Sequence, residues 1–363
     1  MTWTASAIRA ARTQAQLLTG DRAERVADVL DTVIAVQAQD VRPARLAVRA
    51  RSAGLVASDV DTACRDGVAV RTWLMRGTLH LVPRADVRWL LRLFGPRNAA
   101  RYAGRRAQLG LDDELCRRAL AALTTVLRDG PLERARIIEA LAEEGVTIDP
   151  SGQAPAHLLM LAASEGIVCR GPETDRDEPT YVLLDDWVPR TDDEHGDDPG
   201  DQADLRRLAT RYVAGHGPTA PADLAGWSGL PIGTARRAFA AADLVEIDSA
   251  IGPLAVLPGR DRPPPNRSSV RLLGHFDGYL LGYRDRSLTV DPAHDKQVQA
   301  GGGFIMPTVL VDGRAVATWR TTRREVELAP FGELTDRAAR CVRAETADLA
   351  RFLGKPLEWA RVD

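Results

Sequence analysis

Two uncharged amides, Gln37 and Gln39, stand at the end of a helical pattern in the sequence. Apolar residues from Val26 to Ile34 recur at helical spacing, and a helix continued through the motif would point the two amides about 200° apart. A locally extended backbone would instead turn residues i and i+2 to the same side. Two amides on one side can position a water molecule or bind a polar edge of a ligand, because each has an acceptor and a donor.

The residues after the motif indicate a break in the helix. Asp40 is a good N-cap and Pro43 suits a first helical turn, so we predict a new helix just past the motif. The two glutamines would then lie at a junction between helices. Spacing alone favours a simpler interpretation, in which the pair caps backbone groups at a helix end, because an isolated QxQ is a weak signal.

The composition is that of a globular protein with several domains. The 363 residues, 45% apolar and 27% charged, suffice for two or three domains with a sizeable core. No run reaches the roughly 18 apolar residues of a membrane span and the first residues lack a signal-peptide core, so we expect a cytoplasmic protein without membrane attachment. The four cysteines are dispersed without a CxxC pair, which argues against a zinc site or a disulfide framework.

Positive charge is concentrated in the first third of the chain. Residues 1–110 contain 18 arginines against 9 acidic residues, whereas residues 111–199 contain 8 arginines against 21 acidic residues. This distribution indicates a polyanion-binding surface on one part of the chain, although a solvated arginine-rich face explains it as well. We take Arg45, Arg49 and Arg51, just after the glutamine motif, as candidate phosphate contacts.

One order of elements is predicted three times. The Gly-Pro pairs that begin at Gly130 and Gly217 each follow a long amphipathic helix, and two more helices and two short extended runs come after each pair. Helix, helix, helix, strand, strand is the order of a winged helix-turn-helix. The N-terminal third follows it too, with predicted helices near 24–36, 44–52 and 58–65 and a hairpin over 71–83.

We therefore predict an α+β fold, mainly α, with three tandem winged helix-turn-helix units forming a concave surface and a small β-rich C-terminal domain. The predicted domains are residues 1–110, 111–190, 200–260 and 267–363. The acidic stretch from Arg190 is predicted to be an exposed linker, and residues 261–267 a stiff connector. Antiparallel strands around an Asp312-Gly313 turn and a closing helix over 334–352 are predicted in the last domain.

Other kinds of catalytic site have little support. Histidines, cysteines and carboxylates show no HxxxH or CxxC spacing, and GxSxG, P-loop and strand-to-helix GxGxxG motifs are missing, so we expect no metal ion and no cofactor. We interpret His80, Trp227 and Asp277 as structural residues. A flexible hairpin tip is predicted for the glycine run Gly301, Gly302 and Gly303.

Five motifs together resemble one known family. QAQ, RTWLMRGTLHLVP, GWSGL, HFDGYLLGYRDR and GGGFIMPTVLVDGRAVATWR occur in the order found in the winged-helix DNA glycosylases of the AlkZ/YcaQ type. The resemblance spans about residues 17–352 and is closest to the AlkZ branch, which unhooks azinomycin crosslinks from DNA. It implies three winged helix-turn-helix units that form a concave basic surface, a QxQ motif needed for activity, here Gln37 and Gln39, and a β-hairpin in the cleft.

The resemblance implies a monofunctional glycosylase that removes N7-alkylated guanine and leaves an abasic site. Its expected partner is double-stranded DNA carrying alkylated or crosslinked guanine, bound by a monomer. No lysine lies near the motif in the sequence, which fits a hydrolase better than a lyase. The glycine run is the preferred wedge into a DNA groove, and the Asp312-Gly313 turn is its rival.

A different class of protein is the main alternative. Repeated helix-turn-helix units usually only bind DNA, so a winged-helix transcription regulator with a ligand-binding β domain would also fit the predicted elements. A metal-dependent nuclease is disfavoured, because the histidines are not clustered. Release of an alkylated base from DNA would distinguish the glycosylase from both.

Overall fold

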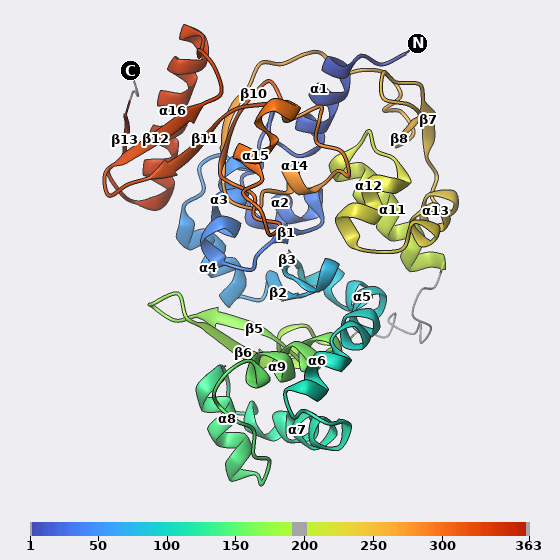
Figure 1. Cartoon of the computed structure of the whole chain (residues 1–363), viewed down its shortest axis with the longest axis vertical. Helices are drawn as coiled ribbons and strands as arrows, with labels where there is room; N and C mark the ends of the chain where they lie inside the picture. Colours follow the sequence, from blue (N-terminus) through green and yellow to red (C-terminus); the bar gives the residue numbers. More distant parts are fainter. Residues whose placement is uncertain (1, 191–201, 361–363) are drawn as a thin grey trace. The chain divides into compact units, whose positions relative to one another are not determined.

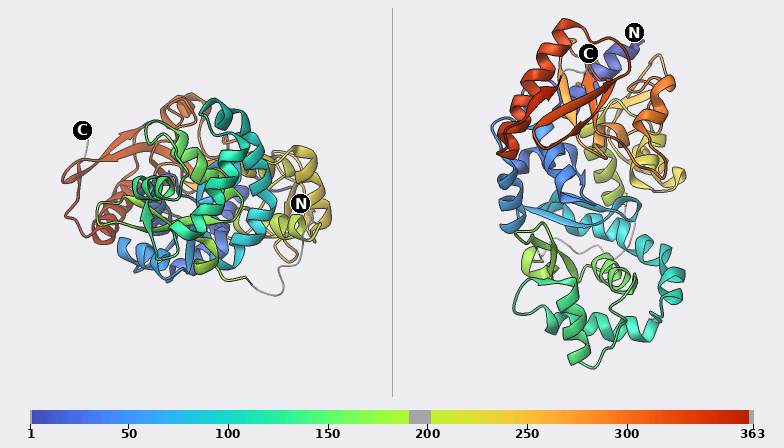
Figure 2. Two further views of the ribbon diagram at one scale, coloured as in Figure 1. Left: turned by 90° about the horizontal axis from the view of Figure 1, so that it is seen from below. Right: turned by 60° about the vertical axis from the view of Figure 1, so that its left-hand side comes forward.

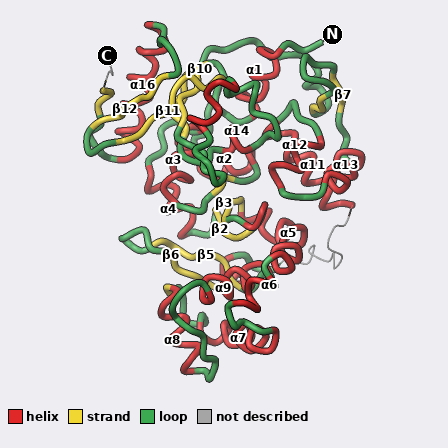
Figure 3. The backbone as a smooth tube through the Cα atoms, in the orientation of Figure 1, coloured by secondary structure: helices red, strands yellow, loops and turns green. Residues whose placement is uncertain are grey.

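The computed structural model describes residues 2–190 and 202–360 (Figure 1). The chain forms two compact units: unit 1 comprises Met1–Val60 and Leu205–Asp363, and unit 2 comprises Asp61–Asp204. Both mix helices and strands, with more helix than strand overall, which confirms the predicted α+β class (Figure 3). Nearly all of the predicted acidic linker lies outside the described residues. No described helix has the length and apolar character that a membrane span requires.

The division into units differs from the predicted domain boundaries. The predicted domain of residues 1–110 belongs partly to each unit, and the first 60 residues form one unit with the C-terminal part of the chain. Long-range buried ion pairs, described below, hold these first residues to the C-terminal part. The four-domain division itself stays a prediction.

Unit 1 begins with short helices. The first elements are α1 (Ala5–Ala15), α2 (Val26–Val33), β1 (Val36–Gln37), α3 (Val41–Arg51) and α4 (Ala57–Arg65), whose last residues belong to unit 2. The buried residues of α2 are Val26, Val29, Leu30 and Val33, so the predicted helical pattern is confirmed up to that point.

The middle of unit 1 contains three helices and a two-stranded sheet. They are α11 (Gln202–His216), α12 (Pro221–Ser228), α13 (Ile232–Ala241) and the antiparallel pair β7 (Val245–Ile247) and β8 (Leu254–Val256). Trp227 is buried against Tyr212, with ring centroids 5.1 Å apart, which confirms its predicted core role. Burial lowers the pKa of the neighbouring His216 to about 3, so this ring is neutral at pH 7.

A five-stranded sheet forms the C-terminal part of unit 1. Its order is β13-β12-β11-β10-β9, with β13 parallel to β12 and the other neighbours antiparallel. The strands are β9 (Val270–Leu273), β10 (Thr308–Val311), β11 (Arg314–Thr321), β12 (Glu325–Pro330) and β13 (Glu358–Ala360). The predicted Asp312-Gly313 turn joins β10 to β11, and both residues have positive φ.

Helices pack against both faces of this sheet. On one face, Val342 and Leu349 of α16 (Asp336–Leu353) are buried against Leu272 and Val309, so the predicted closing helix is confirmed (Figure 2). The other face packs against α14 (Gly278–Leu281) and α15 (Asp295–Val298), which follows a 3-10 turn (Pro292–His294). Adjacent strand residues such as Leu272 and Leu273 therefore point into different cores.

Unit 2 is built around an antiparallel sheet. Four of its strands are β2 (Ala69–Trp73), β3 (Leu79–Pro83), β5 (Val168–Glu173) and β6 (Pro179–Leu183), and β4 (Leu132–Glu133) pairs with β6. The helices are α5 (Val87–Arg101), α6 (Ala103–Gln108), α7 (Asp113–Val126), α8 (Arg134–Glu143), α9 (Ala154–Ser164) and α10 (Leu184–Trp187), with 3-10 turns at Met75–Gly77 and Arg84–Asp86. The hairpin predicted over residues 71–83 is confirmed as β2 and β3.

Two buried arginines hold α3 inside unit 1. The Arg51 guanidinium donates to both carboxylate oxygens of Asp277, at 2.8 and 2.7 Å, and to Oε1 of Gln16 at 2.7 Å. Both partners of the ion pair are about 1% exposed. Asp277 also accepts from the backbone N–H of Tyr279 at the start of α14, so the predicted structural role of this carboxylate is confirmed.

Arg49 ties the same helix to the sheet and to α16. Its guanidinium donates to Oε2 of Glu345 at 2.5 Å and to the carbonyl of Leu272 at 3.2 Å, and it lies 3.3 Å from Oδ2 of Asp348. Glu345 in turn accepts from the Leu272 backbone N–H. Buried guanidinium groups paired in this way are not available to phosphates, so the prediction that Arg49 and Arg51 contact DNA is wrong.

We expect removal of one charge from the Arg51–Asp277 pair to destabilise unit 1. Asp277→Asn leaves a buried guanidinium uncompensated and should cost about 3–5 kcal/mol of unfolding free energy, measured by urea denaturation. Glu327→Gln, which breaks an exposed pair with Arg320, should cost less than about 1 kcal/mol. Equal costs for the two variants would contradict a structural role for the buried pair.

Candidate active site

The glutamine motif lies where α2 ends in a strained turn. Ile34 has φ 63° and ψ −40°, and the Ala35 N–H donates to the Val33 carbonyl at 2.7 Å, which makes a three-residue γ-turn with positive φ. A β-branched residue in this conformation costs on the order of 1–3 kcal/mol, and Ile34 is fully buried, so packing holds it there. The turn stops the helix and starts the extended segment at Val36.

Burial alternates along the glutamine motif. Gln37 is half-buried and Gln39 is exposed, whereas Ala38 between them is fully buried. The strand covers Val36–Gln37, and Gln39 lies in a bend, so the predicted extended backbone is confirmed as far as Gln37. That the two amides share a side stays a prediction.

Helix α3 begins immediately after the motif. The Asp40 side chain accepts from the Arg42 backbone N–H at 2.9 Å, which confirms Asp40 as the N-cap. The cap and the γ-turn fix the segment at both ends. The polar edge that results carries amide donors and acceptors and the positive end of a helix dipole, so it suits water and anionic or polar groups rather than a strong base.

Gly274, between β9 and the HFDGY segment, packs against α3. A Cβ atom added to Gly274 would lie 3.0 Å from Cβ of Leu46 and 3.5 Å from the carbonyl of Pro43, so glycine permits this close approach. The next residue, His275, bonds through Nδ1 with the carbonyl of Ile305, 3.1 Å away. Contacts therefore run from the start of α3 to the segment that carries the glycine run.

The glycine run forms the tip of a small hairpin. An isolated antiparallel bridge pairs Gln299 with Ile305, and the Ala300 N–H donates to the Phe304 carbonyl at 3.0 Å. The tip is exposed, and its residues have positive φ with open space around each Cα: Gly301, Gly302 and Gly303. The predicted hairpin is confirmed, whereas its entry into DNA stays a prediction.

An aromatic cluster at the base of this hairpin was not predicted. Phe304 is 43% exposed and makes edge contacts with His275 and Phe276, with centroids 5.0 and 4.9 Å apart. These three aromatic rings pack together at the base of the glycine tip. The alternating pattern of a strand does not predict such a cluster. The adjacent His275-Phe276 pair, followed by Phe304 directly after the glycines, was the available signal.

The basic first third of the sequence is not simply a basic surface. Besides Arg49 and Arg51, the arginines Arg12, Arg71 and Arg106 are at most 9% exposed. Arg45 is half-buried on α3 and is the one predicted phosphate contact that retains access to solvent. Net charge along the sequence therefore overestimated the charge available to DNA, because part of it neutralises buried carboxylates.

The remaining predicted structural residues fit the interior. His80 is 2% exposed, bonds through Nδ1 with the Thr78 carbonyl, and has its pKa lowered by burial to about 3. The four cysteines are free thiols. Among the described residues, no group of His, Cys, Asp or Glu is arranged to hold a metal ion.

Known proteins resemble this chain over nearly its whole length. The family described as DNA glycosylase AlkZ-like matches residues 30–352. The "Interstrand DNA cross-link repair glycosylase" of Streptomyces sahachiroi is 25% identical over 364 residues, which cover 94% of this chain and 95% of that protein. The solved structure of Streptomyces sahachiroi DNA glycosylase AlkZ has the same fold, with a TM-score of 0.83, 24% identity and full coverage of both chains. Because the family match covers most of the chain, from residue 30 to residue 352, this chain belongs to the AlkZ-like DNA glycosylases.

Proposed function

We propose that this chain hydrolyses the N-glycosidic bond of N7-alkylated guanine in double-stranded DNA and leaves an abasic site. The proposal includes unhooking of bulky interstrand crosslinks of the azinomycin kind, which would make the chain a self-resistance enzyme. The observation that carries it is the burial pattern of residues 37–39, where Gln37 and Gln39 flank the buried Ala38. The name of the Streptomyces sahachiroi relative, a crosslink repair glycosylase, supports the substrate class.

Two neutral amides suit the departure of a cationic base. Alkylation at N7 makes guanine positive, and when the bond from N9 to C1′ breaks, the bonding pair returns to the base, which leaves neutral. Water adds to C1′ as positive charge develops on the sugar, and one water proton goes to solvent. Gln37 and Gln39 would accept hydrogen bonds from this water and direct carbonyl dipoles at the sugar, so a strong base is not needed.

An accessible segment also suits a lesion that cannot leave the duplex. Ordinary glycosylases rotate the target base into a closed pocket, but a crosslinked base is tethered to the opposite strand. Gln39 is exposed and its segment is short, so the amides could approach a base that stays near its place in the helix. This geometry supports a bulky substrate over a small, freely flipping one.

Three winged helix-turn-helix units are the second part of the proposal. In chain order, α11 to β8 runs helix, helix, helix, strand, strand. The series α2 to β3 and α7 to β6 have the same order except for a two-residue strand, β1 or β4, after the first helix. The third helix of the second series, α9, has nine of its eleven residues buried, so it offers no polar face to a DNA groove. A scaffolding role for α9 favours the glycosylase over a transcription regulator that reads DNA with each third helix.

Contacts to DNA would come from α3 and from the glycine hairpin. We retain Arg45 as a phosphate contact, because it is accessible on the helix that begins at the glutamine segment. Gly301, Gly302 and Gly303 would enter a groove, since a tip without side chains approaches DNA closely and Phe304 at its base can pack against the sugar edge. Arg45 and the glycine tip are assigned to DNA contacts because both are accessible to solvent.

The function is tested by removing each amide. Gln37→Ala and Gln39→Ala should each lower the single-turnover excision rate of N7-methylguanine or a crosslinked adduct by roughly 10² to 10³, with duplex affinity nearly unchanged, because one transition-state hydrogen-bonding group is lost. Gln108→Ala, at an exposed position in α6, is the matched control and should excise normally. Normal excision by both active-segment variants would rule out the assignment.

Deletion of the glycine tip tests the wedge. Removing Gly301–Gly303 should slow crosslink unhooking far more than it weakens binding to undamaged duplex, because unstacking a base step costs a few kcal/mol that this loop must offset. A deletion of equal length in the turn between β5 and β6, residues 175–177, serves as control. If unhooking by the tip deletion matches the control, another turn, such as Asp312-Gly313, has to be the wedge.

A further inference from the structure

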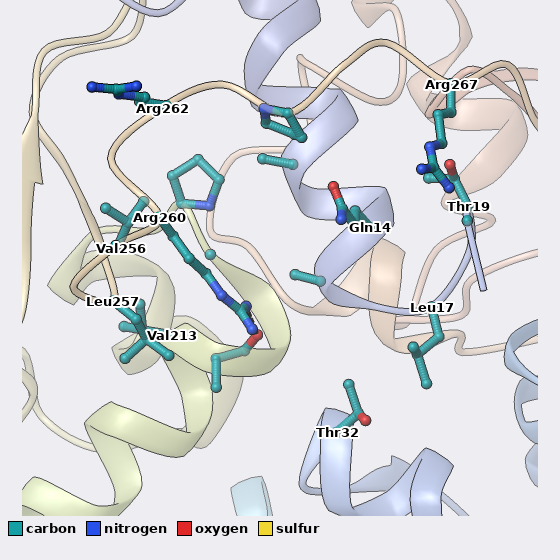
Figure 4. Close-up of a pocket in the computed structure, with 18 of the residues that line it drawn as sticks. Gln14, Leu17, Thr19, Thr32, Val213, Val256, Leu257, Arg260, Arg262 and Arg267 are labelled. Atoms are coloured by element: carbon teal, nitrogen blue, oxygen red, sulfur yellow. Dashed lines mark hydrogen bonds between the residues drawn. The ribbon is translucent and has the colours of Figure 1, made fainter. Parts of the chain in front are cut away.

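Unit 1 contains a cavity that the proposed glycosylase chemistry does not use. Its volume is about 520 Å³, and its walls come from α1, the loop after α1, the end of α11, the end of β8 and the connector that follows β8 (Figure 4). Neither Gln37 nor Gln39 contributes to its lining. The volume lies within the range of pockets that hold small organic ligands, and it is too small for a duplex.

Polar and apolar groups share the wall of this pocket about equally. The apolar part comes from Trp3, Leu17, Val213, Val256 and Leu257, with small alanines of α1 between them. Apolar side chains of this kind bind an aliphatic or flat aromatic body by removing its surface from water.

A few polar groups would orient such a ligand. Gln14 projects into the space from α1, and Thr19 and Thr32 lie along its other side (Figure 4). An amide and two hydroxyls can donate and accept hydrogen bonds, so the ligand is expected to carry polar edges as well as an apolar body.

Positive charge surrounds the same space. The pocket lining includes three arginines, Arg260, Arg262 and Arg267, against one carboxylate, Asp21. Arg260 donates to the Ala214 carbonyl at 3.1 Å, and no ion pair joins any of the three to a carboxylate within the described residues. Guanidinium groups that line a pocket favour an anion, through charge-assisted hydrogen bonds.

The connector holds these arginines in a preset arrangement. Three prolines, residues 263–265, separate Arg262 from Arg267 and stiffen the backbone between them. At its far end, Ser268 Oγ and the Ser269 N–H both donate to Oδ1 of Asp312, each at 2.8 Å. A connector fixed at its end loses little freedom when a ligand binds, which favours affinity.

We propose that this pocket binds a small organic anion, a phosphate ester or carboxylate with an apolar or aromatic body. The apolar side chains of the lining contact the body, and Arg260, Arg262 and Arg267 bind the charged group. The site is separate from the glutamine segment, so binding there does not depend on the proposed excision reaction.

The proposal is tested by titrating the full chain with an anilinonaphthalene sulfonate dye, an aromatic anion that fluoresces in apolar sites. We expect one saturable site, from which GMP displaces the dye at least tenfold more effectively than neutral guanosine. Combined Arg260→Gln, Arg262→Gln and Arg267→Gln should weaken dye binding about tenfold. The matched control, Arg320→Gln, Arg323→Gln and Arg324→Gln on the β11–β12 hairpin, should bind like the parent.

A second variant tests the cavity itself. Ala11→Met keeps the charge and fills part of the space, so it should weaken the dye more than inorganic phosphate. Circular dichroism establishes that each variant is folded. Equal dye affinity in the two triple variants would overturn the proposal. So would displacement of the dye by undamaged duplex at concentrations where GMP has no effect, because the arginines would then serve the DNA backbone.

Discussion

The pairing of two buried arginines with carboxylates from the C-terminal half fixes the helix on which the proposed chemistry depends. Arg49 and Arg51 lie in the last turn of α3, and each is about 1% exposed. Burial of a guanidinium is costly unless a carboxylate compensates it, so α3 is stable in one position only, where Glu345 and Asp277 both reach it. The first turn of α3 then stands at a set place relative to Gly274 and the hairpin behind it.

One end of α3 is held rigidly, and the segment before its other end is accessible. The last turn of α3 is buried in the interior, whereas in the segment before its first turn Gln37 is half-buried and Gln39 is exposed. The γ-turn at Ile34 ends α2, and the Asp40 cap begins α3. The fixed positions of these two helices therefore restrain residues 37–39 between them. In the proposed reaction, amides held in this way would lose little freedom on binding the transition state, which is how weak groups can contribute to catalysis.

Local features of this site were predictable from sequence, and long-range ones were not. Asp40, Pro43 and the helical spacing before them are neighbours in the chain, so the helix break and the extended motif could be predicted. The partners of Arg51 and Arg49 lie 226 and 296 residues away, and nothing near either arginine indicates burial. An arginine that pairs with a distant carboxylate has the same local sequence as one that faces DNA. The pocket beside the connector was hidden for the same reason, because its walls come from separate parts of the chain.

The most direct measurement compares the Gln37→Ala/Gln39→Ala double variant with the two single variants in single-turnover excision of an N7-alkylated guanine, with duplex affinity measured alongside. If the amides act on one water as a unit, the double variant should be about as slow as the slower single variant, and all three should bind duplex like the parent. Excision at the parental rate by the double variant would contradict a catalytic role for this segment.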